Sequence, residues 1–371
     1  MATLTPPFRA DHVGSLLRPV ALRQARARAA RGEIERAALR EVEDAAIQDA
    51  VKGQEACGLQ AITDGEFRRT WFHVDFLERI AGIEAQYTGG AVNFRKTSGE
   101  QLQTTPPRLV VTDTLRHTHP IQGADFDFLK SCASAMPKVA IPSPSMAHFR
   151  AGRAGVSEAA YPNMQDFFDD LARVYREEIA DLAARGCRYI QLDDTNLAYL
   201  CDEKFRENAR RMGEDPDELP HTYAKLINAC LRDRPEDMWV GVHLCRGNFR
   251  SAFVAEGGYE PVAETLFGEV DVDAFFLEYD DERSGGFEPL RLVPKNKVVV
   301  LGVVSSKHAA LERKDDVKRR IDSAAKTLPL EQLCLSPQCG FSSTEHGNDL
   351  SEADQWAKLR LVTEVAADVW G

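Results

Sequence analysis

The chain has 371 residues, and 43% of them are hydrophobic, which is enough for a large core or for two domains of ordinary size. Lys and Arg total 46 against 58 Asp and Glu, and the net charge of −12 makes the chain a poor electrostatic match for nucleic acid or an anionic membrane. The N-terminal segment lacks the apolar core of a signal peptide, and no run approaches the roughly 20 apolar residues of a membrane span. We therefore expect a cytoplasmic protein whose eight cysteines are reduced.

Short apolar runs, rich in β-branched residues, alternate along the chain with longer amphipathic stretches. The runs show no polar alternation, which is typical of parallel strands that are buried on both faces. They predict eight strands, at residues 10–15, 59–66, 138–144, 187–194, 239–245, 272–279, 297–306 and 333–339.

The stretches between these runs predict helices. Residues 163–186, 313–328 and 352–370 repeat apolar side chains every three or four positions. Successive strand–helix units predict a (β/α)₈ barrel, also called a TIM barrel. An open doubly wound sheet is the alternative, but no Gly-x-Gly-x-x-Gly segment follows a strand.

Two segments break this rhythm and are interpreted as insertions into a single catalytic barrel that spans residues 1–371. Residues 82–130 alternate like a β-hairpin with Gly-rich turns, so we expect a flap over the mouth of the barrel. Residues 201–220 are charged and end at a proline, which favours a surface helix and loop with a solvated face.

Polar residues stand at or just past the C-terminal end of each predicted strand. In a parallel barrel these ends form one rim, which is where active sites occur. The residues concerned are Ser15, Glu66, Ser143, Asp193, His243, Cys245, Glu278, Lys307 and Cys339.

Four of these residues are of the types that bind zinc. His243 and Cys245 are two positions apart on one predicted strand, so both side chains point to the same face. Glu278 and Cys339 end later strands of the same wall, although the acidic residues 280–282 compete with Glu278. An imidazole, two thiolates and a carboxylate suit a tetrahedral Zn²⁺ site, and ligands spread over a rigid scaffold favour a catalytic metal.

The other cysteines and histidines receive no metal assignment. The remaining six cysteines are expected to pack as small buried hydrophobes. His117 and His119 are the strongest other pair, but they lie in the predicted flap.

The acidic residues at the ends of predicted strands indicate a site that binds a cation or that carries out acid–base catalysis. Glu66 and Asp193 would suit an ammonium group on a substrate, whereas Asp194 is better placed to cap a helix. The backbone around Ser15 follows a glycine and could bind a carboxylate. Lys307 could be a general acid, an anion ligand or a surface lysine at the start of a loop.

Several of these segments resemble the catalytic barrel of cobalamin-independent methionine synthase. The similar segments are HLCRGN at 243–248, SPQCGF at 336–341, IQLDD at 190–194, HVGS at 12–15 and the strand-end Glu278. That family transfers a methyl group from methyltetrahydrofolate to homocysteine and uses Zn²⁺ to activate the thiol. The resemblance runs from about Asp11 to Trp370 and implies a methyltransferase on a single barrel.

The resemblance also implies roles for individual residues. His243, Cys245, Glu278 and Cys339 match the zinc ligands. Ser15 matches the position that faces the carboxylate of homocysteine, while Glu66 and Asp193 match those that face its ammonium group.

Three departures separate this chain from the full-length enzyme. That enzyme has two barrels, and the half absent here helps to hold the folate, so the resemblance leaves the methyl donor open. The family's Asp-Glu-Pro reads Asp193-Asp194-Thr195, and its catalytic Asp-x-His reads Ser305-Ser306-Lys307. Because His308 is one place off, Lys307 is our candidate for the proton donor. The chain is more similar to short, single-barrel relatives.

The sequence thus predicts a zinc-dependent methyltransferase that converts homocysteine to methionine, with a folate or a corrinoid protein as methyl donor. One alternative is alkyl transfer to another thiol such as coenzyme M, and another is a zinc-binding barrel without catalysis. A uroporphyrinogen-decarboxylase-like activity shares the barrel but favours Arg clusters at its mouth, and Arg68 with Arg69 alone do not make one. We expect a homodimer, because large barrels often associate.

Overall fold

The computed structural model describes residues 5–87 and 90–371, and its centre is a parallel sheet. Six strands are hydrogen-bonded side by side in the order β12-β11-β10-β9-β8-β7, and each neighbouring pair is parallel. Almost all of their residues are buried, which explains the unbroken apolar runs. The strands are β7 (Val139–Pro142), β8 (Tyr189–Asp194), β9 (Trp239–Leu244), β10 (Ala274–Glu278), β11 (Val298–Val304) and β12 (Leu333–Pro337).

Shorter pairings at both edges close this sheet into a (β/α)₈ barrel. At one edge β1 (Ala61–Ile62) pairs in parallel with β6 (Met136–Pro137), which leads directly into β7. At the other edge Asp11 N–H donates to the carbonyl of Leu335 in β12 at 2.9 Å. The two edges then meet, because Leu16 N–H donates to the carbonyl of Gly65 at 3.0 Å.

The first two predicted strands are much shorter than expected. Within 10–15 only Ala10 forms a bridge, and within 59–66 only residues 61–62 are regular strand. The backbone leaves the extended form where φ turns positive, at 132° for Gly14, 67° for Gly65 and 59° for Glu66. The segments are tied by side chains instead, and Thr63 Oγ1 donates to the Gly14 carbonyl at 2.6 Å.

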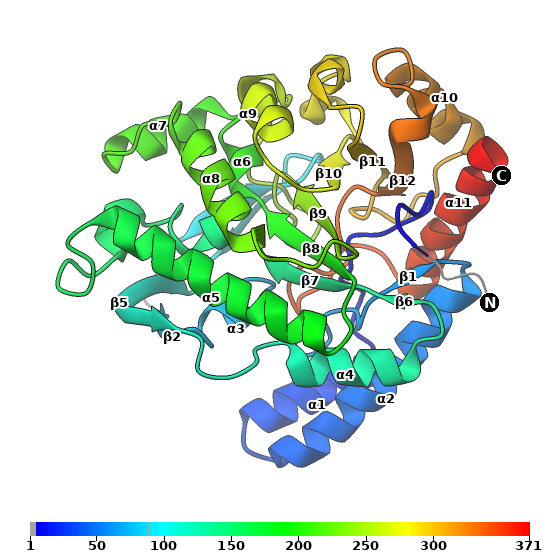
Figure 1. The fold of residues 1–371 in the computed structure, drawn as a ribbon. Coiled ribbons are helices and arrows are strands. Elements are labelled where there is room, and N and C mark those ends of the chain that lie inside the picture. Colours follow the sequence, from blue (N-terminus) through cyan, green and yellow to red (C-terminus); the bar gives the residue numbers. More distant parts are fainter. Residues whose placement is uncertain (1–4, 88–89) are drawn as a thin grey trace.

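Helices surround the barrel (Figure 1). The predicted helices at 163–186, 313–328 and 352–370 are found as α5 (Met164–Ala184), α10 (Lys314–Ala324) and α11 (Glu352–Trp370). The sequence analysis did not predict the two helices at residues 20–30 and 36–56, the second of which lies between the first two strands. The remaining helices are α1 (Val20–Ala30), α2 (Arg36–Ala56), α3 (Val74–Leu77), α4 (Gly123–Cys132), α6 (Asn196–Tyr199), α7 (Glu203–Arg211), α8 (Leu219–Leu231) and α9 (Ala263–Gly268).

The segment predicted as a flap contains two antiparallel ribbons. The outer ribbon pairs β2 (Ala81–Gln86) with β5 (Arg108–Arg116), and the inner one pairs β3 (Val92–Arg95) with β4 (Gln101–Thr104). The hairpin expected over 82–130 is therefore too long at its C-terminal end, where α4 begins at residue 123. Phe126 and Leu129, one helical turn apart, bury one face of α4 there.

Apolar side chains also fill the inside of the barrel below the rim. One cluster gathers residues from several strands, namely Ala61, Tyr189, Ala274, Phe276, Val300 and Cys334, together with Phe8. Lys138 is buried there with its ammonium 3.0 Å from Asp11. This filled interior leaves the rim at the C-terminal ends of the strands as the place for a site.

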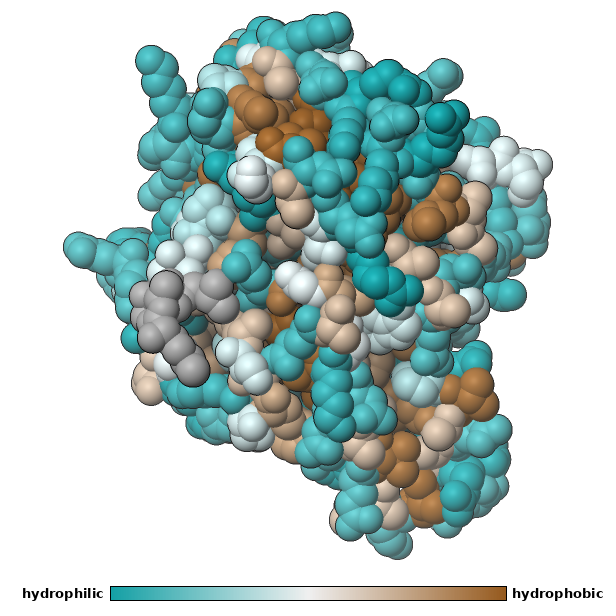
Figure 2. All heavy atoms as spheres, turned by 90° about the vertical axis from the view of Figure 1, so that its right-hand side faces the viewer, coloured by the Kyte–Doolittle hydropathy of each residue, from teal (hydrophilic) through white to brown (hydrophobic). Residues whose placement is uncertain are grey.

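The outer surface is mixed in character. On the face shown in Figure 2, hydrophilic side chains predominate and hydrophobic ones show in separate groups between them. Among the described residues, no helix is long and apolar enough to cross a membrane.

Candidate metal and thiol site

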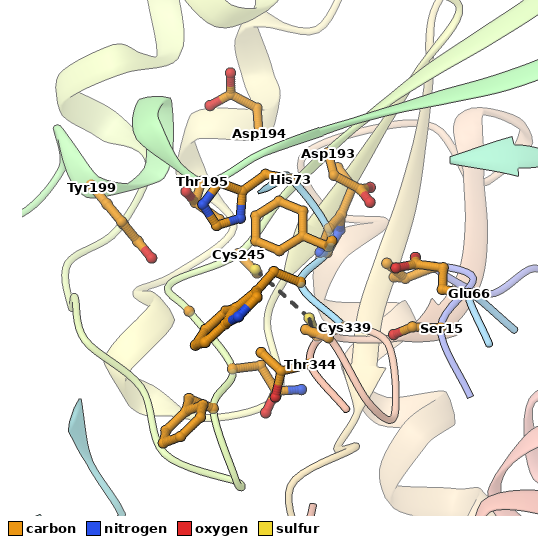
Figure 3. Close-up of a pocket in the computed structure, with 18 of the residues that line it drawn as sticks. Ser15, Glu66, His73, Asp193, Asp194, Thr195, Tyr199, Cys245, Cys339 and Thr344 are labelled. Carbon is orange, nitrogen blue, oxygen red and sulfur yellow. Dashed lines mark hydrogen bonds between the residues drawn. The ribbon is translucent and has the colours of Figure 1, made fainter. Parts of the chain in front are cut away.

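The structure brings three of the four predicted metal ligands together. His243 and Cys245 leave the end of β9 on the same side, and Cys339 follows β12. One ligand atom from each lies within 4.8 Å of the others, and the two sulfurs are 3.7 Å apart (Figure 3). Two Zn–S bonds of about 2.3 Å at the tetrahedral angle would place the sulfurs about 3.8 Å apart, so the spacing fits zinc.

His243 supplies an independent sign that this group suits a cation. Its side chain is buried, yet neither ring nitrogen has a hydrogen-bond partner among the described residues. A buried polar atom without a partner costs stability, so such atoms tend to mark a place where a ligand binds. His117, which belongs to the other candidate pair, instead lies 2.7 Å from Glu178.

The two thiols differ in acidity because they share a hydrogen bond. That bond from Cys245 holds the pKa of Cys339 well below its ordinary value despite burial, with His243 and Lys307 contributing. The same bond, together with burial, raises the pKa of Cys245. The lowered pKa of Cys339 favours its thiolate, which is the form that binds a cation, and cation binding would release the proton of Cys245 as well.

Glu278 ends β10 beside this group, but it is not one of the three residues within 4.8 Å. Its Oε1 accepts from Arg283 at 2.6 Å and from Lys307 at 3.1 Å, and its Oε2 accepts from the backbone N–H of Arg246 at 2.5 Å. Although burial alone would raise the pKa of Glu278, Lys307, Arg283 and Arg246 hold it well below its ordinary value. Glu278 is thus a fixed carboxylate, and its role as a metal ligand stays a prediction.

Lys307 contacts Glu278 rather than the open space of the site. Its ammonium lies 3.1 Å from Glu278 and 3.8 Å from Asp280, and it does not line the pocket described next. Its role as proton donor also stays a prediction.

A pocket that contains about 630 Å³ of empty space, part of it open to solvent, is lined by the three ligands. Its wall includes the ligands and also Ser15, Glu66 and Asp193, as Figure 3 shows. Asp193 on β8 pairs in register with His243 on β9, so its carboxylate stands next to the metal group. The predicted binding residues and the predicted ligands therefore share one cavity.

The two acids of the pocket are unusually reluctant to ionise. Burial raises the pKa of Glu66 to about 8, although Arg69, 3.6 Å from its Oε2, opposes the rise, and the nearby Asp193 carboxylate adds to it. Burial also raises the pKa of Asp193 to about 6, although His243 and a hydrogen bond from Gln191 oppose the rise. A cation placed between the two carboxyl groups would stabilise the ionised form of each and so lower both pKa values.

Asp194 has the capping role that the sequence favours. Its Oδ1 accepts from the backbone N–H of Asn196 at 2.8 Å and of Leu197 at 2.9 Å, at the start of α6.

Ser15 is held against the loop that carries Cys339. Its carbonyl accepts from Phe341 N–H at 2.9 Å, and a Cβ at Gly340 would lie only 1.9 Å from Ser15 Oγ. Arg18, which is buried, tightens the same region with five hydrogen bonds. Its acceptors are the carbonyls of Ser342, Thr344, Glu66 and Arg69 and the hydroxyl of Ser342.

The sequence analysis missed the aromatic wall of the pocket. Trp71 stacks on Phe249 with their ring planes 7° apart, and Phe94 of the flap packs on the same Phe249 at 5.3 Å. His73 is buried in this wall, and neither of its ring nitrogens has a partner among the described residues. Burial and the nearby Arg150 lower the pKa of His73 well below its ordinary value. The Trp-Phe-His run at 71–73 was the available signal.

Comparisons with known proteins identify the family of this chain. The sequence model of the family described as "Cobalamin-independent synthase, Catalytic domain" matches residues 8–367. The chain belongs to this family. It is 47% identical to the uncharacterized protein YxjH of Bacillus subtilis (strain 168), over 98% of this chain and 95% of that protein.

Other similar proteins have more informative names. A structure from Listeria monocytogenes, provisionally named a vitamin-B12-independent methionine synthase, superposes with a TM-score of 0.79 at 36% identity and covers 100% of both chains. The methionine synthase of Pyrococcus abyssi (strain GE5 / Orsay) is 23% identical over 80% of this chain and 76% of that protein. The fold and the methyltransferase family predicted from the sequence are confirmed.

Proposed function

We propose that this member of the family is a zinc-dependent methyltransferase that transfers a methyl group to the sulfur of homocysteine and so forms methionine. The observation that carries the proposal is the meeting of two residue groups in one cavity. The His243, Cys245 and Cys339 group forms part of the same wall as Ser15, Glu66 and Asp193.

The ligand group suits a catalytic zinc rather than a purely structural one. Three protein ligands leave one position of a tetrahedral ion for a substrate atom or for Glu278. Bound there, zinc would lower the pKa of a thiol that takes the open position. The carboxylate of Glu278, whose charge acts on both His243 and Cys245, would balance part of the charge of the ion.

The acids would hold the other end of homocysteine. Its ammonium group would lie against Glu66 and Asp193, which both gain by ionising beside a cation. Its carboxylate would face Ser15 and the neighbouring backbone. Fixing both ends of a short amino acid places its sulfur for in-line attack on a methyl group, and such positioning supplies much of the rate in methyl transfer.

The acidic pocket favours an amino-acid thiol over coenzyme M. A sulfonate in place of the ammonium group would keep both buried acids in the neutral form, whereas an ammonium group gains an ion pair with each acid that ionises beside it. A barrel that only stores zinc has no need for this pair of acids beside the ligands.

The test is zinc content together with X-ray absorption at the zinc edge, measured with and without homocysteine. Wild type should hold one zinc per chain and gain a sulfur neighbour when homocysteine is added. Cys339→Ser should lose most of the zinc, because it removes the more acidic thiol. Cys132→Ser is the matched control, because Cys132 is only half-buried and lies outside the ligand group.

Bound zinc whose coordination does not change when homocysteine is added would contradict the proposal. A chain that binds no zinc would also contradict it. A sulfur neighbour gained from 2-mercaptoethanesulfonate but not from homocysteine would move the activity to the coenzyme M alternative.

A further inference from the structure

The side chains of β8 that point into the barrel face the N-terminal segment of the chain, residues 11–15. Tyr189, Gln191 and Asp193 alternate along β8, so all three lie on the same face of the strand. The ring of Tyr189 belongs to the apolar cluster inside the barrel, which identifies this face as the inner one. Residues 11–15 begin beside β12, and β9 to β12 separate them from β8 along the wall. Contacts between the two therefore cross the interior of the barrel.

Two successive side chains of β8 reach this segment by hydrogen bonds. The hydroxyl of Tyr189 donates to Asp11 Oδ2 at 2.6 Å, while the ammonium of Lys138 lies 3.0 Å from Asp11 Oδ1. Two residues further along both segments, Gln191 Nε2 donates to the carbonyl of Val13 at 2.7 Å. All of these residues are buried. The two bonds fix the separation of β8 and the N-terminal segment on the way to the rim.

The third pair in this series is Asp193 and Ser15, which stand at the rim. Both line the pocket that the three metal ligands share (Figure 3). In the part of the chain that the structure describes, no hydrogen bond joins Asp193 to Ser15. The space between them is where the proposed function places the head of an amino acid, which carries one positive and one negative group.

Gln191 connects the second pair to the third. The same Nε2 that bonds to Val13 also donates to Asp193 Oδ1 at 2.7 Å. Because both acceptors are oxygens, the amide can lie only one way round, with its nitrogen toward them. Its Oε1 is consequently buried without a hydrogen-bond partner among the described residues, which costs stability. A methionine would fill a similar space without that cost, so packing alone does not account for a glutamine here.

We propose that Gln191 is a positioning residue for amino-acid binding, whose amide holds Asp193 and residues 13–15 at the separation that the head of an α-amino acid spans. The identity of the substrate rests on the proposed function. Gln191 does not line the pocket, so it acts through Asp193 and the backbone of Val13. With both sides held in place beforehand, Asp193 and Ser15 lose little freedom when the substrate binds, and this pre-organisation strengthens binding.

The experiment compares homocysteine with 1-propanethiol, which has the same thiol end but lacks the amino-acid head. Both affinities are measured by titration calorimetry on zinc-loaded protein without a methyl donor. Wild type should bind homocysteine more tightly than propanethiol. The Gln191→Met protein should bind homocysteine about tenfold more weakly than wild type but propanethiol within about twofold of it, because only the head depends on pre-organisation. Damage to the fold would instead weaken the binding of both thiols.

Tyr189→Phe is the matched control. It removes a hydrogen bond from the same inner face of β8, but it leaves both acceptors of Gln191 in place. The Tyr189→Phe protein should therefore bind homocysteine as wild type does. If Gln191→Met does not fold, Gln191→Asn takes its place, because asparagine keeps the amide but is one methylene too short to reach both acceptors. It should show the same selective loss of homocysteine binding.

Equal affinity for homocysteine in wild type and in the Gln191 variant would overturn the role of Gln191. Wild type that binds the two thiols equally would also overturn it, because the pocket would then not hold an amino-acid head.

The proposed function can fail separately. If neither thiol binds to the zinc, L-methionine replaces them as the probe, because its head needs no metal. Tighter binding of L-methionine by wild type than by the Gln191 variant would then mean that the thiol chemistry is wrong and the role of Gln191 stands. Equal binding would overturn both.

Discussion

Replacing Lys307 with methionine tests how the site holds its charges. The ammonium of Lys307 lies 3.1 Å from Glu278 and 3.8 Å from Asp280, and all three side chains are buried or nearly so. Breaking a buried ion pair from one side costs about 3 to 5 kcal/mol, because a carboxylate is left without its partner. Arg283 remains 2.6 Å from Glu278, so we expect a loss at the lower end, about 3 kcal/mol.

This loss can be read as a shift in melting temperature. At about 2.1 cal/mol/K per residue, a chain of 371 residues has an unfolding entropy of about 0.8 kcal/mol/K. A loss of about 3 kcal/mol therefore lowers Tm by about 4 °C in a calorimetric scan.

Lys297→Met is the control for this measurement. Lys297 pairs with Asp271 at 2.8 Å, but Asp271 is 74% exposed, so the pair is worth at most about 1 kcal/mol and its loss about 1 °C. A Lys307→Met protein that melts within about 1 °C of wild type would refute the reasoning that Lys307 anchors Glu278.

The same position separates two roles for Lys307. An anchoring role predicts that Lys307→Arg keeps most of the methionine-forming activity, because arginine preserves the ion pair. A proton-donor role predicts the opposite, because a guanidinium does not release its proton near neutral pH.

Three further predictions follow from the site. Burial raises the pKa of Glu66 from 4.5 to about 8, so between these pH values the folded state keeps a proton that the unfolded chain loses, and the stability of the fold falls as pH rises through them. The Glu66→Gln protein should therefore melt above wild type at pH 8 but near it at pH 5, and it should no longer bind homocysteine. Equal Tm differences from wild type at both pH values would contradict this reasoning. The Gly340→Ala protein should bind as much zinc as wild type but have a KM for homocysteine that is at least tenfold higher. The new methyl group would displace Ser15, because a Cβ at residue 340 would lie 1.9 Å from Ser15 Oγ. An unchanged KM would show that Ser15 does not contribute to homocysteine binding. Removing the metal with dipicolinate should lower Tm by about 3 °C, because a ligand at a hundred times its Kd stabilises the folded protein by about 2.7 kcal/mol. Adding zinc back should restore the original Tm. An unchanged Tm would mean that no metal binds the folded chain.

The rim of the site could be predicted from the sequence because two simple rules place it. Apolar runs mark the buried strands, and parallel strands collect their C-terminal ends on one side. Those rules bring His243, Cys245 and Cys339 together although nearly a hundred residues separate the last two. They also bring Asp193 next to His243, because adjacent strands pair in register.

The remainder of the site depends on loops, whose sequences have no periodic pattern of apolar residues from which their structure could be predicted. Trp71 and Phe249 stack, but each lies in an irregular segment, and nothing in either segment indicates the other. The partners of Glu278 also come from separate loops, since Arg283 follows β10 and Lys307 follows β11. The charged pattern of α7 predicts a solvated face. The sequence does not show that the flap segment lies across a pocket from α7.

The closure of the barrel through Arg18 sets an order of events during synthesis of the chain. This guanidinium, near the start of the chain, bonds to the carbonyls of Ser342 and Thr344, more than three hundred residues later. Contacts between such distant parts form slowly and late, and a nascent chain folds from its N-terminus. A ribosome that has passed Cys245 but not Cys339 therefore carries two of the three predicted metal ligands without the third. Zinc bound as we propose would reach its full set of ligands only after Cys339 has been synthesised, so the order of translation would set the earliest moment at which the site could be filled.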